Sequence, residues 1–143
     1  KIKRVEIFMK SPAKSFGIYS HMGGKIVTLV EIDGKSGHEA LAREIAMHVA
    51  AESPEYLKPE DVPPAVLARE EEIARGQVTG KPPQIADKIV AGKLQAFYDQ
   101  VCLIGQKFVK DNTVTIAALV ANEAKKSGET LTLKRFIRWK VGE

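Results

Sequence analysis

The chain has 143 residues, of which 44% are hydrophobic and 28% charged, and its net charge is +4. These values are typical of a soluble globular protein, and the interleaved acids and bases form no basic stripe of the kind that nucleic-acid-binding proteins carry. The single cysteine, Cys102, excludes an internal disulfide, and no stretch approaches the roughly 18 apolar residues that a membrane span needs, so neither an oxidising compartment nor a membrane partner is implied.

The first part of the chain predicts antiparallel strands. Alternating side chains over residues 4–9 indicate one strand. Two more are expected over residues 16–21 and 25–32, joined by a tight turn at residues 22–24. Two of the three turn residues are glycines, which tolerate the positive φ of such turns, so the sequence predicts a β-hairpin here.

A helix is predicted from about residue 37 to residue 53. Aliphatic residues recur every four positions in this stretch, as on one face of a helix: Leu41, Ile45 and Val49. His48 lies near this face, and we expect it to be partly buried. His38 falls in the first turn, where we expect it to be exposed.

An antiparallel helical hairpin, resembling a short coiled coil, is predicted over about residues 62–104. Pro63-Pro64 starts its first helix, and Gly80, Lys81 and Pro82 form its tip. The second helix carries an apolar stripe with alternating spacings of four and three: Val90, Leu94, Phe97, Val101 and Ile104. This stripe needs a second surface, either across the hairpin or on a partner, which includes another copy of the chain.

The last part of the chain predicts a linker, a helix and a strand. Residues 108–111 form the linker, and Thr113 caps a helix that ends at Ser127-Gly128. The closing strand over residues 131–141 alternates so that Trp139 shares one buried side with Leu131, Leu133 and Ile137. The predicted class is therefore α+β, with a small antiparallel sheet of three to four strands, helices against it, and the inserted helical hairpin.

No residues have the spacing of a reactive or metal site. The three histidines and Cys102 form no ligand pair, and there is no nucleophile or nucleotide-binding motif. We therefore expect no enzyme, metal or cofactor. Two places remain as candidate binding sites. His21 is presented at the end of a strand, and Phe108-Val109 puts two apolar residues in a loop, where they either fold back on the core or anchor a partner.

A series of short motifs resembles the elongation factor Ts family, in family order and over nearly the whole chain. The motifs are Ile45-Ala-Met-His-Val49, Pro54 with Tyr56, Val62-Pro63, Gly80-Lys-Pro82, Ile85-Ala-Asp-Lys-Ile-Val90, Gly92-Lys93-Leu94 with Phe97, Gln106, Phe108-Val-Lys-Asp111, Thr113-Val114, Gly128-Glu129, Arg135-Phe136-Ile-Arg138 and Val141-Gly-Glu143. The resemblance implies that residues 1–143 form the second, C-terminal core subdomain of such a factor, in the cytoplasm of a bacterium or in an organelle.

The resemblance also implies a partner, elongation factor Tu, and the residues that contact it. This subdomain of the family docks mainly on the third domain of Tu, and the positions that match are His21 and a segment with Gln106, Phe108 and Val109. The family usually has proline where this chain has Lys107. We expect no direct binding of nucleotide and no binding of nucleic acid, whereas self-association through the helical hairpin is a further expectation.

One family motif is missing from residues 1–143. The Thr-Asp-Phe-Val segment, which in the family reaches into the GTP-binding domain of Tu, does not occur. The resemblance therefore implies a part that docks and contributes to GDP exchange without carrying it alone. The competing interpretation is a basic RNA- or ribosome-binding domain that uses four cations near the end of the chain: Lys134, Arg135, Arg138 and Lys140.

Overall fold

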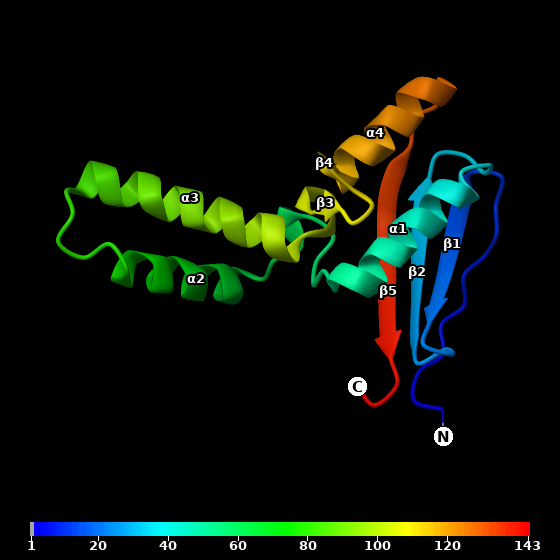
Figure 1. Cartoon of the computed structure of the whole chain (residues 1–143), viewed down its shortest axis with the longest axis horizontal. Coiled ribbons are helices and arrows are strands. Elements are labelled where there is room, and N and C mark those ends of the chain that lie inside the picture. Colours follow the sequence, from blue (N-terminus) through cyan, green and yellow to red (C-terminus); the bar gives the residue numbers. More distant parts are fainter. Residues whose placement is uncertain (1) are drawn as a thin grey trace. The chain divides into compact units, whose positions relative to one another are not determined.

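A computed structural model describes residues 2–143, which divide into two compact units. Unit 1 comprises residues 2–50 and 120–143, and unit 2 comprises Ala51–Leu119. Helices and small antiparallel sheets make up both units (Figure 1), which confirms the predicted α+β class. The elements are β1 (Lys14–His21), β2 (Ile26–Asp33), α1 (Glu39–Glu52), α2 (Pro64–Gly76), α3 (Pro83–Val101), β3 (Lys107–Phe108), β4 (Asp111–Thr115), α4 (Ile116–Ser127) and β5 (Thr132–Lys140).

Unit 1 is a three-stranded antiparallel sheet in the order β1-β2-β5, with α1 across one face. The turn between β1 and β2 has positive φ at Met22, Gly23 and Gly24, as the hairpin signal predicts. Helix and sheet approach closely, because a side-chain carbon on Gly17 would collide with the backbone of Ala42. The buried hydroxyl of Thr28 donates a hydrogen bond to the carbonyl of Ala46 at 2.6 Å.

The predicted orientation of Trp139 is wrong, because β5 contains an irregularity that no alternation pattern reveals. Pairing with β2 shifts register between Glu31 and Ile32. Leu133 pairs with Ile32 on the side that α1 covers, whereas Trp139 pairs with Val27 on the opposite, open face. One extra residue in a strand reverses the direction of every side chain beyond it.

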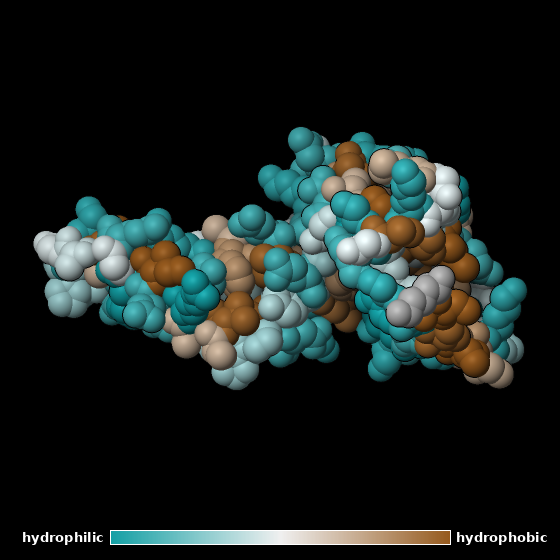
Figure 2. Space-filling view, turned by 90° about the horizontal axis from the view of Figure 1, so that it is seen from below, coloured by the Kyte–Doolittle hydropathy of each residue, from teal (hydrophilic) through white to brown (hydrophobic). Residues whose placement is uncertain are grey.

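The predicted first strand, residues 4–9, is also wrong: this segment pairs with no strand. Its odd-numbered apolar residues are exposed, and Phe8 and Arg4 instead contact the open face of the sheet. The Phe8 ring lies edge-on to Phe16 with centroids 5.9 Å apart, and the Arg4 guanidinium lies 5.0 Å from the ring centroid of Trp139. The alternating side chains of residues 4–9 therefore contact the sheet on one side, although the backbone of this segment forms no hydrogen-bonded ladder with it. Figure 2 shows hydrophobic side chains gathered on the surface of unit 1, where the exposed apolar residues include Ile2, Val5, Ile7 and Met9.

Unit 2 contains the predicted helical hairpin, in which α2 and α3 run antiparallel (Figure 1). The apolar stripe of α3 packs across the hairpin. Val90 and Leu94 contact Ala74 and Val78, and the base of the hairpin forms a second cluster: Val62, Val101, Cys102, Tyr56, Val66, Leu67, Phe97 and Tyr98. None of the described helices has the length and apolar character needed to cross a membrane.

The predicted linker at residues 108–111 is instead the turn of a small β-hairpin formed by β3 and β4. The cap of α4 likewise lies two residues beyond its predicted place, at Thr115 and not at Thr113. The hydroxyl of Thr115 accepts a hydrogen bond from the Ala118 N–H at 3.1 Å, which is the geometry of a helix N-cap. Thr113 instead bonds to the carboxylate of Asp111 at 2.6 Å.

Candidate partner-binding site

The segment from Gln106 to Val109 is held from inside unit 2. The side-chain NH2 of Gln106 donates to the backbone carbonyl of Gln100 at 2.7 Å, and the backbone carbonyl of Gln106 accepts from the Ile116 N–H at 3.0 Å. Gln106 and Phe108 are each only 7% exposed. These two residues therefore position the segment and present little side-chain surface to a partner.

Val109 is the residue of this segment that reaches the surface. It occupies the turn between β3 and β4 and is 43% exposed, although an aliphatic side chain of this size favours burial. Beside it lies an open groove of about 480 Å³, whose lining includes the charged residues Glu52, Asp99 and Lys107. An exposed apolar residue on a turn next to a polar groove is a suitable anchor for a protein surface.

His21 lies at the end of β1 in unit 1 and is exposed, as predicted. Tyr19 precedes it by two residues on the same strand face. Its hydroxyl lies 3.3 Å from His21 Nδ1, and the two rings stack with centroids 6.0 Å apart. Arg43 of α1 in turn lies 5.7 Å from the centroid of the Tyr19 ring. The imidazole is therefore supported by Tyr19, which was not predicted as a site residue. Residues two apart on a strand lie on the same face, so the sequence could have indicated this contact.

The hairpin tip, with Gly80, Lys81 and Pro82, is exposed, and Gly80 has a positive φ of 87°. The stripe of α3 is used within the hairpin, so it offers little to another copy of the chain. The large hydrophobic side chains that the hairpin still exposes are Ile73 at 48% and Ile85 at 50%.

Two features that a reactive centre could use are limited in the described residues. Residues 2–143 contain no group of three histidine, cysteine or acidic side chains that could hold a metal ion. Cys102 is 1% exposed, and burial raises the pKa of its thiol, which disfavours the nucleophilic thiolate. The predicted structural role of this cysteine agrees with its place in the cluster at the base of the hairpin.

Comparison with known proteins decides the family. The chain matches the family described as elongation factor Ts over residues 1–143. It belongs to the elongation factor Ts family. Elongation factor Ts of Protochlamydia amoebophila is 53% identical over 143 residues, which cover 100% of this chain and 51% of that protein. Elongation factor Ts of Chlamydia muridarum is 48% identical over 129 residues, or 90% of this chain and 46% of that protein.

A third elongation factor Ts, from Chlamydia trachomatis serovar L2, is 44% identical over 142 residues, which cover 99% of this chain and 50% of that protein. The chain thus spans about half the length of the elongation factor Ts relatives that it matches. The family resemblance of the sequence motifs is confirmed. The roles of His21, Gln106, Phe108, Val109 and the hairpin tip stay predictions.

Proposed function

We propose that this chain binds elongation factor Tu and contributes to guanine-nucleotide exchange, mainly as a docking part. Membership of the elongation factor Ts family supports the choice of partner. The observation that carries the proposal is Val109, which is exposed on a turn whose neighbours Gln106 and Phe108 are buried. Such an arrangement holds an apolar anchor away from its own core, so little conformational entropy is lost when a partner covers it.

Docking and exchange are separate contributions to the free energy. A factor weakens GDP binding only by as much as it prefers the nucleotide-free form of Tu, so contacts that are equal in both forms supply affinity alone. The Thr-Asp-Phe-Val segment does not occur in residues 1–143. We therefore propose that these residues bind Tu in both forms, without binding nucleotide themselves and without enzymatic activity, in the cytoplasm of a bacterium.

The test is the binding of this chain to purified elongation factor Tu, with and without GDP, together with a GDP-release assay. Val109→Ala and His21→Ala should each weaken binding about fivefold, which corresponds to about 1 kcal/mol for an interface anchor. Ile73→Ala removes a comparably exposed aliphatic side chain from α2 and should leave the Kd unchanged. The proposal is wrong if both site variants bind as the wild type does. Release of GDP as fast as with a complete factor would contradict the docking role.

The alternative, an RNA- or ribosome-binding domain, is less well supported by the sheet. Arg138 pairs with Thr28 and lies on the face that α1 covers, whereas Arg135 pairs with Glu31 on the opposite face. The Nε of Arg135 also lies 3.0 Å from a carboxylate oxygen of Glu31. The four cations therefore form no common stripe. Strong, salt-sensitive binding to RNA would nevertheless favour this alternative.

Self-association through the hairpin is the least supported partner interaction, because its apolar stripe packs within unit 2. Only scattered apolar residues such as Ile73 and Ile85 are left to form a contact between copies. Sedimentation at high concentration tests it directly, and a monomer would exclude it.

A further inference from the structure

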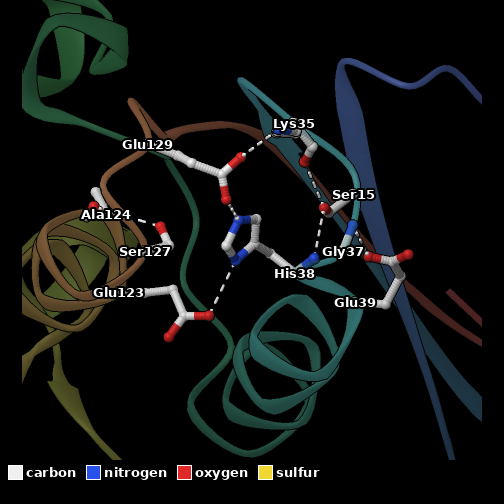
Figure 3. A network of polar contacts seen from close by, with 9 residues as sticks. All are labelled: Ser15, Lys35, Gly37, His38, Glu39, Glu123, Ala124, Ser127 and Glu129. Atoms are coloured by element: carbon white, nitrogen blue, oxygen red, sulfur yellow. Dashed lines mark hydrogen bonds and ion pairs between the residues drawn. The ribbon is translucent and has the colours of Figure 1, made fainter.

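His38 is buried at the start of α1, contrary to the expectation that it is exposed. It is 5% exposed, and its carbonyl accepts the Ala42 N–H at 3.0 Å. Its own N–H donates to the hydroxyl of Ser15 on β1 at 3.0 Å, and that hydroxyl donates to the carbonyl of Lys35 at 2.7 Å. The backbone around His38 is therefore fixed to the sheet, and its ring points into unit 1 (Figure 3).

Both ring nitrogens of His38 face carboxylates. Nδ1 lies 2.9 Å from an oxygen of Glu123 on α4, and Nε2 lies 2.9 Å from an oxygen of Glu129 in the connection between α4 and β5 (Figure 3). A neutral imidazole carries one N–H, so one nitrogen would turn a lone pair toward a carboxylate. Two donated hydrogen bonds require the imidazolium.

The same geometry argues against a metal ion at this place. The two carboxylates lie on opposite nitrogens of the ring, so no single ion could be bound by His38 and by both Glu123 and Glu129. A cation at the beginning of a helix is also disfavoured by the helix dipole. The two carboxylates compensate for that cost, which makes the charge on His38 dependent on them.

We propose that His38 is a pH-sensitive clamp, which holds the C-terminal half of α4 and residues 128–131 on the start of α1 while its ring is protonated. Among the described residues, two charged side chains contact the ring. Glu123 belongs to α4, and Glu129 belongs to the segment that follows α4. Loss of the ring proton removes one of the two bonds and leaves a buried lone pair facing a carboxylate, which costs more than an absent bond.

Other charged groups complete the surroundings of the clamp. Lys35, in the loop between β2 and α1, places its ammonium 3.4 Å from the second oxygen of Glu129. On α1 itself, Glu39 accepts the Gly37 N–H at 2.8 Å. β1 contributes only the uncharged Ser15. The ring thus contacts two carboxylates, one of which also pairs with the ammonium of Lys35, while the carboxylate of Glu39 bonds to the loop backbone.

The pKa shifts of the pair agree in sign with a clamp that is closed while His38 is protonated and Glu129 is ionised. The hydrogen bond that the ring donates to Glu123, with the one that it donates to Glu129, raises the pKa of His38 above 6.5 despite its burial. The hydrogen bond with His38, aided by Lys35, lowers the pKa of Glu129 below 4.5. A raised histidine pKa stabilises fully below 6.5, and this stability is lost as pH rises through the folded value. The Glu129 contribution is present above 4.5 and is lost as pH falls through its own folded value. The clamp therefore opens as pH rises through the folded pKa of His38, and it also weakens where Glu129 becomes protonated.

Nitrogen-15 NMR of the imidazoles in the full chain tests the clamp, together with hydrogen exchange of backbone amides across the same pH range. At pH 7 both ring nitrogens of His38 should be protonated, and the ring should titrate above 6.5. As it titrates, amides of residues 120–131 should lose protection, whereas those of β1 and β2 should lose none beyond the ordinary base dependence of exchange. A neutral His38 ring at pH 7, or unchanged relative protection of residues 120–131 through its titration, would overturn the proposal.

A charge-matched pair of variants separates the clamp from a general electrostatic effect. Glu123→Gln should lower the titration midpoint of His38 and move the loss of α4 protection to the same lower pH. Glu72→Gln makes the same charge change on an exposed position of α2 and should move neither. Equal shifts in both variants, or none in Glu123→Gln, would show that Glu123 does not hold the proton on His38.

Discussion

The two units of this chain are stabilised by different kinds of contact. Unit 2 relies on residues close in sequence, because its helical hairpin packs α2 on α3 through aliphatic side chains across one short turn. Unit 1 pairs β2 with β5, two strands about a hundred residues apart, so that Glu31 lies opposite Arg135. The comparison teaches that a pattern in one segment determines its partner only where that partner is the adjacent segment.

The units also differ in what they bury. The clusters of the hairpin are apolar, whereas unit 1 buries Glu31 at 2% exposure and His38 at 5%. Burial by itself would raise the pKa of the Glu31 carboxyl, but hydrogen bonds from Lys14 and Arg135 lower it below 4.5. A lowered carboxyl pKa supplies stability that is lost as pH falls through the folded value. The buried ionisable groups of unit 1 should therefore make its stability depend on pH.

The largest expected loss of stability comes from a substitution that disrupts unit 1 alone. Gly17→Ala places a side-chain carbon against the backbone of Ala42, which cannot yield as a flexible side chain would. We expect a loss of about 3 kcal/mol in the free energy of unfolding, at the upper end for overpacking. Thermal unfolding measures the loss, and hydrogen exchange should place it in β1, β2 and α1.

Gly92→Ala is the matched control for that variant. Gly92 lies in α3 with nothing within 4 Å of an added side-chain carbon, so alanine should stabilise the helix by about 0.5–1 kcal/mol. If Gly17→Ala is tolerated as well as Gly92→Ala, then α1 does not lie as close to the sheet as described.

The same contrast explains which predictions succeeded. The helical hairpin, the amphipathic helix of unit 1 and the β1–β2 hairpin all follow from local periodicity and turn residues, and all are confirmed. Two errors are local, the linker at residues 108–111 and the cap at Thr113, and the others concern non-local features. The register shift opposite Glu31 reverses Trp139, and residues 4–9 contact the sheet without pairing with it. Burial of His38 depends on Glu123 and Glu129, which lie 85 and 91 residues away.

For the candidate site, the sequence located the segments and not the direction of their side chains. Gln106, Phe108 and Val109 all match the family at a contact segment, yet the structure buries the first two and exposes the third. The distinction depends on a two-residue turn between β3 and β4, with strands too short to show a periodicity. Sequence reasoning therefore predicts the place of the site, and the structure selects its surface residue.

A smaller effect should loosen unit 2 and leave unit 1 intact. Val90 is 3% exposed in the middle of the hairpin, and Val90→Ala removes two carbon atoms from it. At about 0.8 kcal/mol for each, with a small cavity left behind, we expect a loss of about 2 kcal/mol. Hydrogen exchange should show faster exchange in α2 and α3, with β1, β2 and β5 unchanged. Ile73→Ala, on the exposed face of α2, should cost no more than about 0.5 kcal/mol. Faster exchange throughout both units would mean that they unfold together.

The smallest expected effect concerns the start of α4, the helix that passes from unit 2 into unit 1. Thr115→Ala removes the hydroxyl that accepts the Ala118 N–H and should cost about 1 kcal/mol, the usual value of a helix N-cap. Thr113→Ala removes a bond to the exposed Asp111 and should cost less, because water can replace it. Thermal unfolding of the two variants compares them directly. A larger loss for Thr113→Ala than for Thr115→Ala would indicate that Thr113 is the N-cap, as the sequence predicted. The helix would then begin two residues earlier.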